Sequence, residues 1–161
     1  MMEGSLILLA EDDENHIFMV QDAFKRARLL NPLYVVRDGE EAIAYLAGEG
    51  RYQNRLEFPL PSLFLLDLKM PRLDGFAVLR WIRQQESLCG LRIIVLTSSD
   101  HTDEIKLAYQ LGANSFLHKP ADFQEFIVLM NAVQGYWLWL DREPEISRPP
   151  LQPILSTTRF G

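Results

Sequence analysis

The chain of 161 residues has one cysteine, Cys89, and no long apolar run. A lone cysteine excludes an intrachain disulfide framework and is typical of proteins from a reducing compartment. A membrane-spanning helix needs roughly 20 consecutive apolar residues, and no segment approaches that length. The N-terminus also lacks the basic region and the long apolar region of a secretory signal peptide. These absences predict a cytoplasmic protein that does not associate with membranes.

An excess of positive charge is lacking as well, since 16 basic residues face 22 acidic ones and the net charge is -6. Binding to nucleic-acid phosphates needs clustered Lys and Arg, so we expect no nucleic acid among the partners. The histidines His16, His101 and His118 lack the spacing of zinc ligands, and each is interpreted as a surface or strand residue. The 48% of hydrophobic residues suffices for one globular domain with a core.

Short apolar runs alternate along the chain with segments of helical periodicity. The runs have the length of strands that are buried on both faces. Because every crossover then carries a helix, we expect an α/β fold with a doubly wound, five-stranded parallel sheet. The expected strands are 5–10, 33–36, 62–66, 92–97 and 115–119, and the expected helices are 14–29, one within 38–50, 75–86, 102–111 and 122–140.

Polar side chains follow four of the expected strands. Ligands of open parallel sheets bind beyond the carboxyl ends of the strands, so these side chains should converge on one rim. Converging carboxylates need a cation or raised pKa values, and Mg²⁺ prefers oxygen ligands that it shares with phosphate. A carboxylate can form an aspartyl-phosphate while an ammonium and a hydroxyl hold the phosphoryl oxygens. The residues are Glu11, Asp12, Asp13, Asp67, Thr97 and Lys119.

Four stretches, "ILLAEDDE" (7–14), "LFLLDLKMPRLDGF" (63–76), "IIVLTSSD" (93–100) and "GANSFLHKP" (112–120), together resemble the receiver domain of the response regulators of two-component signalling. The resemblance covers about residues 5–140. It implies a flavodoxin-like (βα)5 fold with the strand order 2-1-3-4-5. It also implies a signalling protein, not an enzyme with other substrates, that takes a phosphoryl group from a phosphohistidine of a sensor histidine kinase.

The resemblance also implies chemical roles for residues at the rim. Asp67 matches the phosphoacceptor, and Lys119 matches the lysine of the family's motif. Glu11 and Asp12 match the acidic pair that holds Mg²⁺, with Asp12 as the direct ligand. The backbone carbonyl of Lys69 matches a further metal ligand, beside the carboxylate of Asp67.

Two more residues match the family's conformational switch. Thr97 would move toward the phosphoryl group, and Phe116 would turn into the space that Thr97 leaves. The family's lysine–proline bond is commonly cis, which predicts a cis peptide before Pro120. Asp13 lies just beyond the acidic pair and is interpreted as an acid in the first turn of the helix.

The chain departs from most response regulators after the last expected helix. We predict a receiver domain over 1–141 and a Pro-rich tail over 142–161, with no output domain. The output would then be a contact with a downstream protein or an onward phosphoryl transfer. The segment 48–61 is longer than most connections between elements. Together with the aromatic stretch "GYWLWL" (135–140), it is similar to the small regulators that partner bacterial phytochromes, which are red-light-sensing histidine kinases.

That aromatic stretch also predicts an interface. Consecutive helical residues point about 100° apart, so Tyr136, Trp137 and Trp139 cannot all face one core. Exposed apolar patches usually mark contacts with other chains. We therefore expect a homodimer through this end of the last helix.

Other functions remain open at this stage. An aspartyl phosphatase of the haloacid dehalogenase type would carry a second Asp two residues after the nucleophile, where this chain has Lys69. A flavodoxin-like nucleotide or flavin site would need a Gly- or Ser/Thr-rich loop after the first strand, where "AEDDEN" would repel phosphate. A receiver that shuttles phosphate within a multistep relay, or one that binds partners without phosphorylation, would have the same fold.

Overall fold

The computed structural model describes residues 5–133 and 135. Its five strands are β1 (Ile7–Ala10), β2 (Leu33–Val36), β3 (Leu63–Leu66), β4 (Arg92–Thr97) and β5 (Ser115–His118). Its five α-helices are α1 (Glu14–Arg26), α2 (Gly39–Ala47), α3 (Gly75–Arg83), α4 (Thr102–Gln110) and α5 (Phe123–Val133). Two short 3-10 helices, η1 (Gly50–Tyr52) and η2 (Glu86–Leu88), lie in the connections before β3 and β4.

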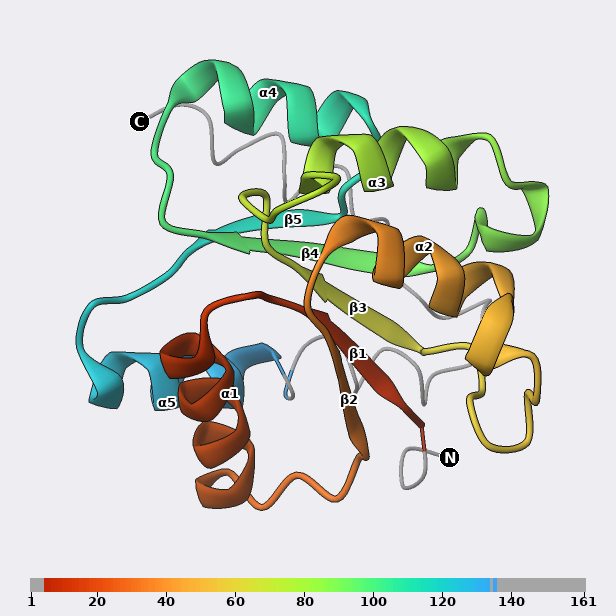
Figure 1. The fold of residues 1–161 in the computed structure, drawn as a ribbon. Helices are drawn as coiled ribbons and strands as arrows, with labels where there is room; N and C mark the ends of the chain where they lie inside the picture. Colours follow the sequence, from red (N-terminus) through yellow and green to blue (C-terminus); the bar gives the residue numbers. More distant parts are fainter. Residues whose placement is uncertain (1–4, 134, 136–161) are drawn as a thin grey trace, which may run out of the picture.

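The strands form one parallel sheet in the order β2-β1-β3-β4-β5. Helices α1 and α5 lie side by side on one face, and α2, α3 and α4 cover the other (Figure 1). Fold class and strand order are therefore confirmed. No helix within the described residues is long and apolar enough to cross a membrane.

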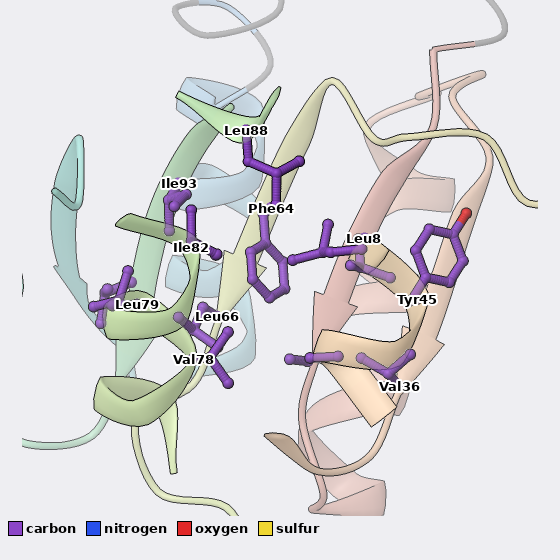
Figure 2. Close-up of a cluster of buried hydrophobic side chains, with 14 of the residues drawn as sticks. Leu8, Val36, Tyr45, Phe64, Leu66, Val78, Leu79, Ile82, Leu88 and Ile93 are labelled. Carbon is purple, nitrogen blue, oxygen red and sulfur yellow. The ribbon is translucent and has the colours of Figure 1, made fainter. Parts of the chain in front are cut away.

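Strand residues alternate between two hydrophobic clusters, one on each face of the sheet. Leu8 and Phe64 pack with Tyr45 beneath α2 and α3 (Figure 2), while Ile7 and Leu65 pack beneath α1 and α5. The side chains of β1 and β3 are almost completely buried, which explains why their sequences are continuous apolar runs. Each buried Leu, Ile or Phe side chain of these strands contributes about 1.5–3 kcal/mol to folding.

Three aspartates begin helices at the carboxyl edge of the sheet. The side chains of Asp13, Asp38 and Asp74 accept hydrogen bonds from backbone N–H groups in the first turns of α1, α2 and α3. Such caps satisfy donors that would otherwise lack a partner at the helix terminus. Asp13 was interpreted as an acid in the first turn of the helix. It lies one position earlier, immediately before α1, and caps the helix.

Some helix ends differ from the expectations. Helix α3 ends at Arg83 rather than at 86, because the chain turns and forms η2 before β4. Helix α1 ends at Arg26, and Arg28 then adopts a left-handed backbone with φ of 58°. The expected continuation of the last helix to residue 140, the tail 142–161 and the proposed dimer residues Tyr136, Trp137 and Trp139 lie outside the described residues. They stay predictions.

Candidate functional site

Three carboxylates meet where β1 and β3 end. Glu11 and Asp12 follow β1, and Asp67 follows β3, its neighbour in the sheet. Ligand atoms of the three side chains lie within 4.8 Å of one another. Glu11 and Asp67 are buried, whereas Asp12 is exposed. The structure thus brings together carboxylates that are more than 50 residues apart in the chain, as the parallel topology predicts.

Lys119 completes this group from β5, across the sheet. Its Nζ lies 2.5 Å from Glu11 Oε1 and 3.3 Å from Asp67 Oδ2. The side chain is buried, and the backbone N–H of Lys119 donates to Thr97 O on β4 at 2.7 Å. Glu11, Asp12, Asp67 and Lys119 are called the carboxyl-edge cluster below. All four were expected at the rim from the sequence.

His16 is a neighbour of the cluster that the sequence did not reveal. Its Nδ1 lies 3.0 Å from Lys119 Nζ and 3.7 Å from Glu11 Oε1. The sequence interpreted it as a surface or strand residue, and its side chain is indeed about one third exposed, but its contact with the cluster was not expected. The signal that could have found it is its place four residues after Asp12, because the first turn of α1 starts at the rim where the carboxylates converge.

Charge within the cluster is incompletely balanced. Burial raises the pKa of Glu11 to about 7, with a further increase from the negative charge of Asp67, although the hydrogen bond from Lys119 opposes both. The cluster holds three carboxylates and one ammonium, so it carries an excess of negative charge when all are ionised. Such an excess favours a bound cation.

The donor set fits a hard divalent cation. The side-chain ligands available are carboxylate oxygens from Glu11, Asp12 and Asp67, and no His or Cys belongs to this group of ligands. Mg²⁺ and related ions bind through one or two carboxylates and complete their shells with water or phosphate. The exposed Asp12 leaves one side of the group open to solvent. The predicted role of the Lys69 carbonyl stays a prediction.

The loop after Asp67 turns sharply beneath it. The backbone N–H of Lys69 lies 3.3 Å from Asp67 Oδ1, and the N–H of Gly75 donates to Leu68 O at 2.8 Å. A Cβ at Gly75 would lie 2.6 Å from the carbonyl oxygen of Asp67, so only glycine fits here. Arg72 adopts a left-handed backbone, and its Nε donates to Asp38 Oδ2 at 2.9 Å. The loop thus places the start of α3 directly against Asp67.

Thr97 ends β4 beside the cluster and is buried. Its Oγ1 lies 3.3 Å from the backbone N–H of Ser99. The hydroxyl of Ser99 in turn hydrogen-bonds the carboxylate of Glu104 on α4. This chain of contacts links the expected switch residue to helix α4.

Phe116 lies on β5 opposite Val95 of β4. It is partly buried against the hydrophobic cluster beneath α3 and α4. Its backbone N–H donates to the hydroxyl of Tyr109 at 3.1 Å. The expected cis bond before Pro120 is not present, since the described residues contain no cis peptide. The trans form is the lower in energy for most X–Pro bonds.

Comparisons with known proteins agree with this arrangement. The model of the response regulator receiver domain matches residues 7–131. The response regulator Rcp1 of Synechocystis is 34% identical over 83% of this chain and 88% of its own length. A probable methanogenesis regulatory protein, FilR2 of Methanothrix harundinacea, is 35% identical over 86% of this chain and 87% of its own length.

Solved structures of response regulators superpose on the chain. The response regulator RPA3017 in red light signalling of R. palustris has a TM-score of 0.79 at 35% identity, covering 83% of this chain and 93% of that one. The phosphorylated cyanobacterial phytochrome response regulator RcpA has a TM-score of 0.78 at 33% identity, covering 84% and 94%. The Mn²⁺-bound form of Rcp1 has a TM-score of 0.77 at 32% identity, covering 91% and 99%. The chain belongs to the family of response regulator receiver domains.

Proposed function

We propose that Asp67 accepts a phosphoryl group from a phosphohistidine of a sensor histidine kinase, in a reaction that requires Mg²⁺. The observation that carries this proposal is the position of Asp67. Its carboxylate lies at the end of a buried strand, near the ammonium of Lys119 and within a group of carboxylates that includes Glu11 and Asp12. A nucleophile, a counter-charge and a set of metal ligands therefore meet at one point.

Each residue of the carboxyl-edge cluster has its own role in the phosphoryl transfer. An oxygen of Asp67 forms the new bond to phosphorus while the bond from phosphorus to the histidine nitrogen of the donor breaks. The ammonium of Lys119, 3.3 Å from Asp67 Oδ2, is placed to contact a phosphoryl oxygen as that bond forms. Glu11, Asp12, Asp67 and the carbonyl of Lys69 would hold Mg²⁺, which spreads the charge of the phosphoryl oxygens when bound.

Thr97 and Phe116 would carry the signal away from the site. The Thr97 hydroxyl contacts Ser99 in the present state, and it would turn toward the phosphoryl group once that group is attached. Phe116 would then fill the space that Thr97 leaves, which changes the surface of α4 and β5. The protein would catalyse only its own phosphorylation and dephosphorylation, and would act on a downstream protein or phosphotransfer partner.

A phytochrome is the kinase that we propose as the phosphoryl donor. RcpA is a phytochrome response regulator and RPA3017 acts in red light signalling, and both match this chain at 33% to 35% identity. FilR2 has a similar sequence identity of 35%, so identity alone does not favour a phytochrome. The proposal rests on the fact that RPA3017 belongs to red light signalling and RcpA to a phytochrome. A gene for a photoreceptor kinase beside that of the chain would support it.

Incubation with acetyl phosphate, followed by measurement of the intact mass, tests the phosphoryl transfer. Wild-type protein should gain the mass of one phosphoryl group in the presence of Mg²⁺ and lose it again with time. Asp67→Asn should gain none, because the amide cannot replace the attacking carboxylate. An equal gain by Asp67→Asn, or none by the wild type, would show that the assignment is wrong.

A further inference from the structure

We propose that His16 is a positioning residue for Lys119, because its Nδ1 accepts a hydrogen bond that the ammonium donates. The role of Lys119 in holding the phosphoryl group rests on the function proposed above. The contact with His16 does not, and it can be tested separately.

The hydrogen-bonding capacity of Lys119 carries this inference. An ammonium has three N–H donors and accepts no hydrogen bond. Three acceptors surround Nζ, namely Glu11 Oε1 at 2.5 Å, His16 Nδ1 at 3.0 Å and Asp67 Oδ2 at 3.3 Å. Each donor therefore has one acceptor, and the imidazole supplies an acceptor that no carboxylate supplies.

The same contact assigns the tautomer of His16. Because the ammonium can only donate, Nδ1 must present its lone pair, and the ring proton of the neutral imidazole then resides on Nε2. The backbone of His16 is held by the helix cap, since its N–H lies 3.3 Å from the Oδ1 of Asp13. The residue that carries the acceptor is therefore anchored in the first turn of α1.

The three distances also indicate which hydrogen bond of Lys119 is replaced by one to a phosphoryl oxygen. Glu11 and His16 hold the ammonium more closely than Asp67 does, so the N–H that points to Asp67 is the one free to turn to a phosphoryl oxygen. Without His16, a second N–H would need an acceptor in a buried place, and Asp67 is the nearest carboxylate after Glu11, which already accepts from the ammonium. Lys119 would then bind the nucleophile more tightly and release it less readily.

Four substitutions of His16 separate the effect of the acceptor from that of the bulk of the ring. His16→Asn places Oδ1 the same number of bonds from the backbone as Nδ1, whereas His16→Leu has the shape of Asn without an acceptor. His16→Gln carries its oxygen one bond further out, at the place of Nε2. His16→Ala, which favours the helix, serves as a second variant without an acceptor if Leu disturbs folding.

We expect His16→Leu to slow phosphorylation by acetyl phosphate on the order of tenfold, the scale of one hydrogen bond to a charged group. His16→Asn should restore the rate to within about twofold of the wild type, and His16→Gln should not restore it. A structural role alone would leave Asn and Leu alike. Equal rates for the Asn and Leu variants would overturn the proposal.

The ¹H–¹⁵N NMR signal of the Lys119 ammonium provides a readout that needs no phosphoryl transfer. Three acceptors should slow its proton exchange with water, and the signal should broaden in His16→Leu and persist in His16→Asn. An identical signal in wild type and His16→Leu would refute the contact. If the wild type fails to take up a phosphoryl group while the NMR difference is found, only the proposed function is wrong.

Discussion

Two clusters of side chains occupy different parts of the molecule. The carboxyl-edge cluster gathers like charges around one ammonium. The aromatic cluster is formed by Tyr34, Tyr45, Tyr52 and Phe58, which belong to β2, to α2 and to the segment 48–61 that leads to β3 (Figure 1). Its ring centroids lie 4.9 to 6.1 Å apart, with several pairs edge to face.

Polar groups of the aromatic cluster have partners of matching chemistry. The hydroxyl of Tyr45 donates to Pro59 O at 2.8 Å, and that of Tyr52 donates to Glu41 Oε2 at 2.7 Å. Burial raises the pKa of Tyr45 to about 12, so its hydroxyl stays a donor at neutral pH. This cluster is satisfied without any ligand, whereas the carboxyl-edge cluster gathers three carboxylates around one ammonium and is not. The difference separates a group whose polar atoms are satisfied within the fold from one that could hold a metal ion.

Among the substitutions that test this comparison, Arg55→Met should change the free energy of unfolding most. Its guanidinium donates to the carbonyl oxygens of Tyr45, Leu46 and Phe58 at 2.7 to 3.1 Å, which ties the segment 48–61 to the end of α2. Arg55→Met keeps much of the apolar stem but leaves the carbonyls without this donor. We expect a loss of about 2 kcal/mol in the free energy of unfolding, measured with urea.

Arg55→Lys is the matched control, because it keeps the charge at the helix C-terminus but not the forked geometry. It should retain about half of the stabilisation. Equal stability of Arg55→Met and wild type would mean that the segment is held by its aromatic contacts alone.

Glu11→Gln should raise the free energy of unfolding at neutral to alkaline pH, whereas Arg55→Met lowers it. The pKa of Glu11 is raised above its ordinary value of 4.5, so between that value and about pH 7 the folded protein binds more protons than the unfolded chain. Stability without metal should therefore fall as the pH rises through this window, and Gln should remove the fall. At pH 8 the variant should be more stable than wild type by about 1 kcal/mol.

Unfolding measured with a chelator present, from pH 4 to pH 8, checks this prediction. The prediction would be contradicted if, without metal, the wild type became more stable relative to Glu11→Gln as the pH rises from 4 to 8. The two substitutions together sharpen the comparison, since removing a polar partner should destabilise one cluster and stabilise the other.

The sequence predicted the carboxyl-edge cluster almost completely, and for a physical reason. Parallel strands end at one edge, so Asp12, Asp67 and Lys119 had to converge once their strands were recognised. His16 was missed because its contact depends on where one side chain of α1 points, and its place four residues after Asp12 was not used as a signal. The order of the strands came from the resemblance to a family, because alternation alone does not determine it.

The aromatic cluster was not predicted, because Tyr34, Tyr45, Tyr52 and Phe58 are separated along the chain and follow no common period. The segment 48–61 was recognised as unusually long, but its length alone does not show what anchors it. Only packing brings Arg55 to the carbonyls of α2. The bond before Pro120 is trans, so an expectation taken from the family was wrong there.

Tyr52→Phe should lower the free energy of unfolding by about 1 kcal/mol, since the hydroxyl group that donates to Glu41 is lost within a partly buried network. Tyr34→Phe is the matched control. The hydroxyl of Tyr34 accepts from the exposed Arg51, so its loss should cost about half as much or less. A larger loss in Tyr34→Phe than in Tyr52→Phe would reverse the order that the structure gives.

Asp38→Asn should have the smallest effect, about 0.5 kcal/mol at neutral pH. Burial opposes the charge of Asp38, but the N–H of Glu41 and the guanidinium of Arg72 hold its pKa below the ordinary value. This contribution is present above the ordinary pKa and is lost as the pH falls through the lowered one. Asn keeps the cap but loses the charge.

Acid titrations of wild type and Asp38→Asn, followed by circular dichroism, measure that difference. The two stabilities should approach each other at low pH. A gap that widens on acidification would show that Arg72 does not stabilise the charged form of Asp38.

Titration with Mg²⁺, followed in two-dimensional amide NMR spectra, tests the difference between the two clusters most directly. The account predicts saturable shifts at residues around Asp12 and Asp67, unchanged signals at Tyr52 and Phe58, and loss of the shifts in Asp12→Asn. No saturable shift at the carboxyl edge, or equal shifts in Asp12→Asn, would contradict the claim that this cluster is arranged to be completed by a cation.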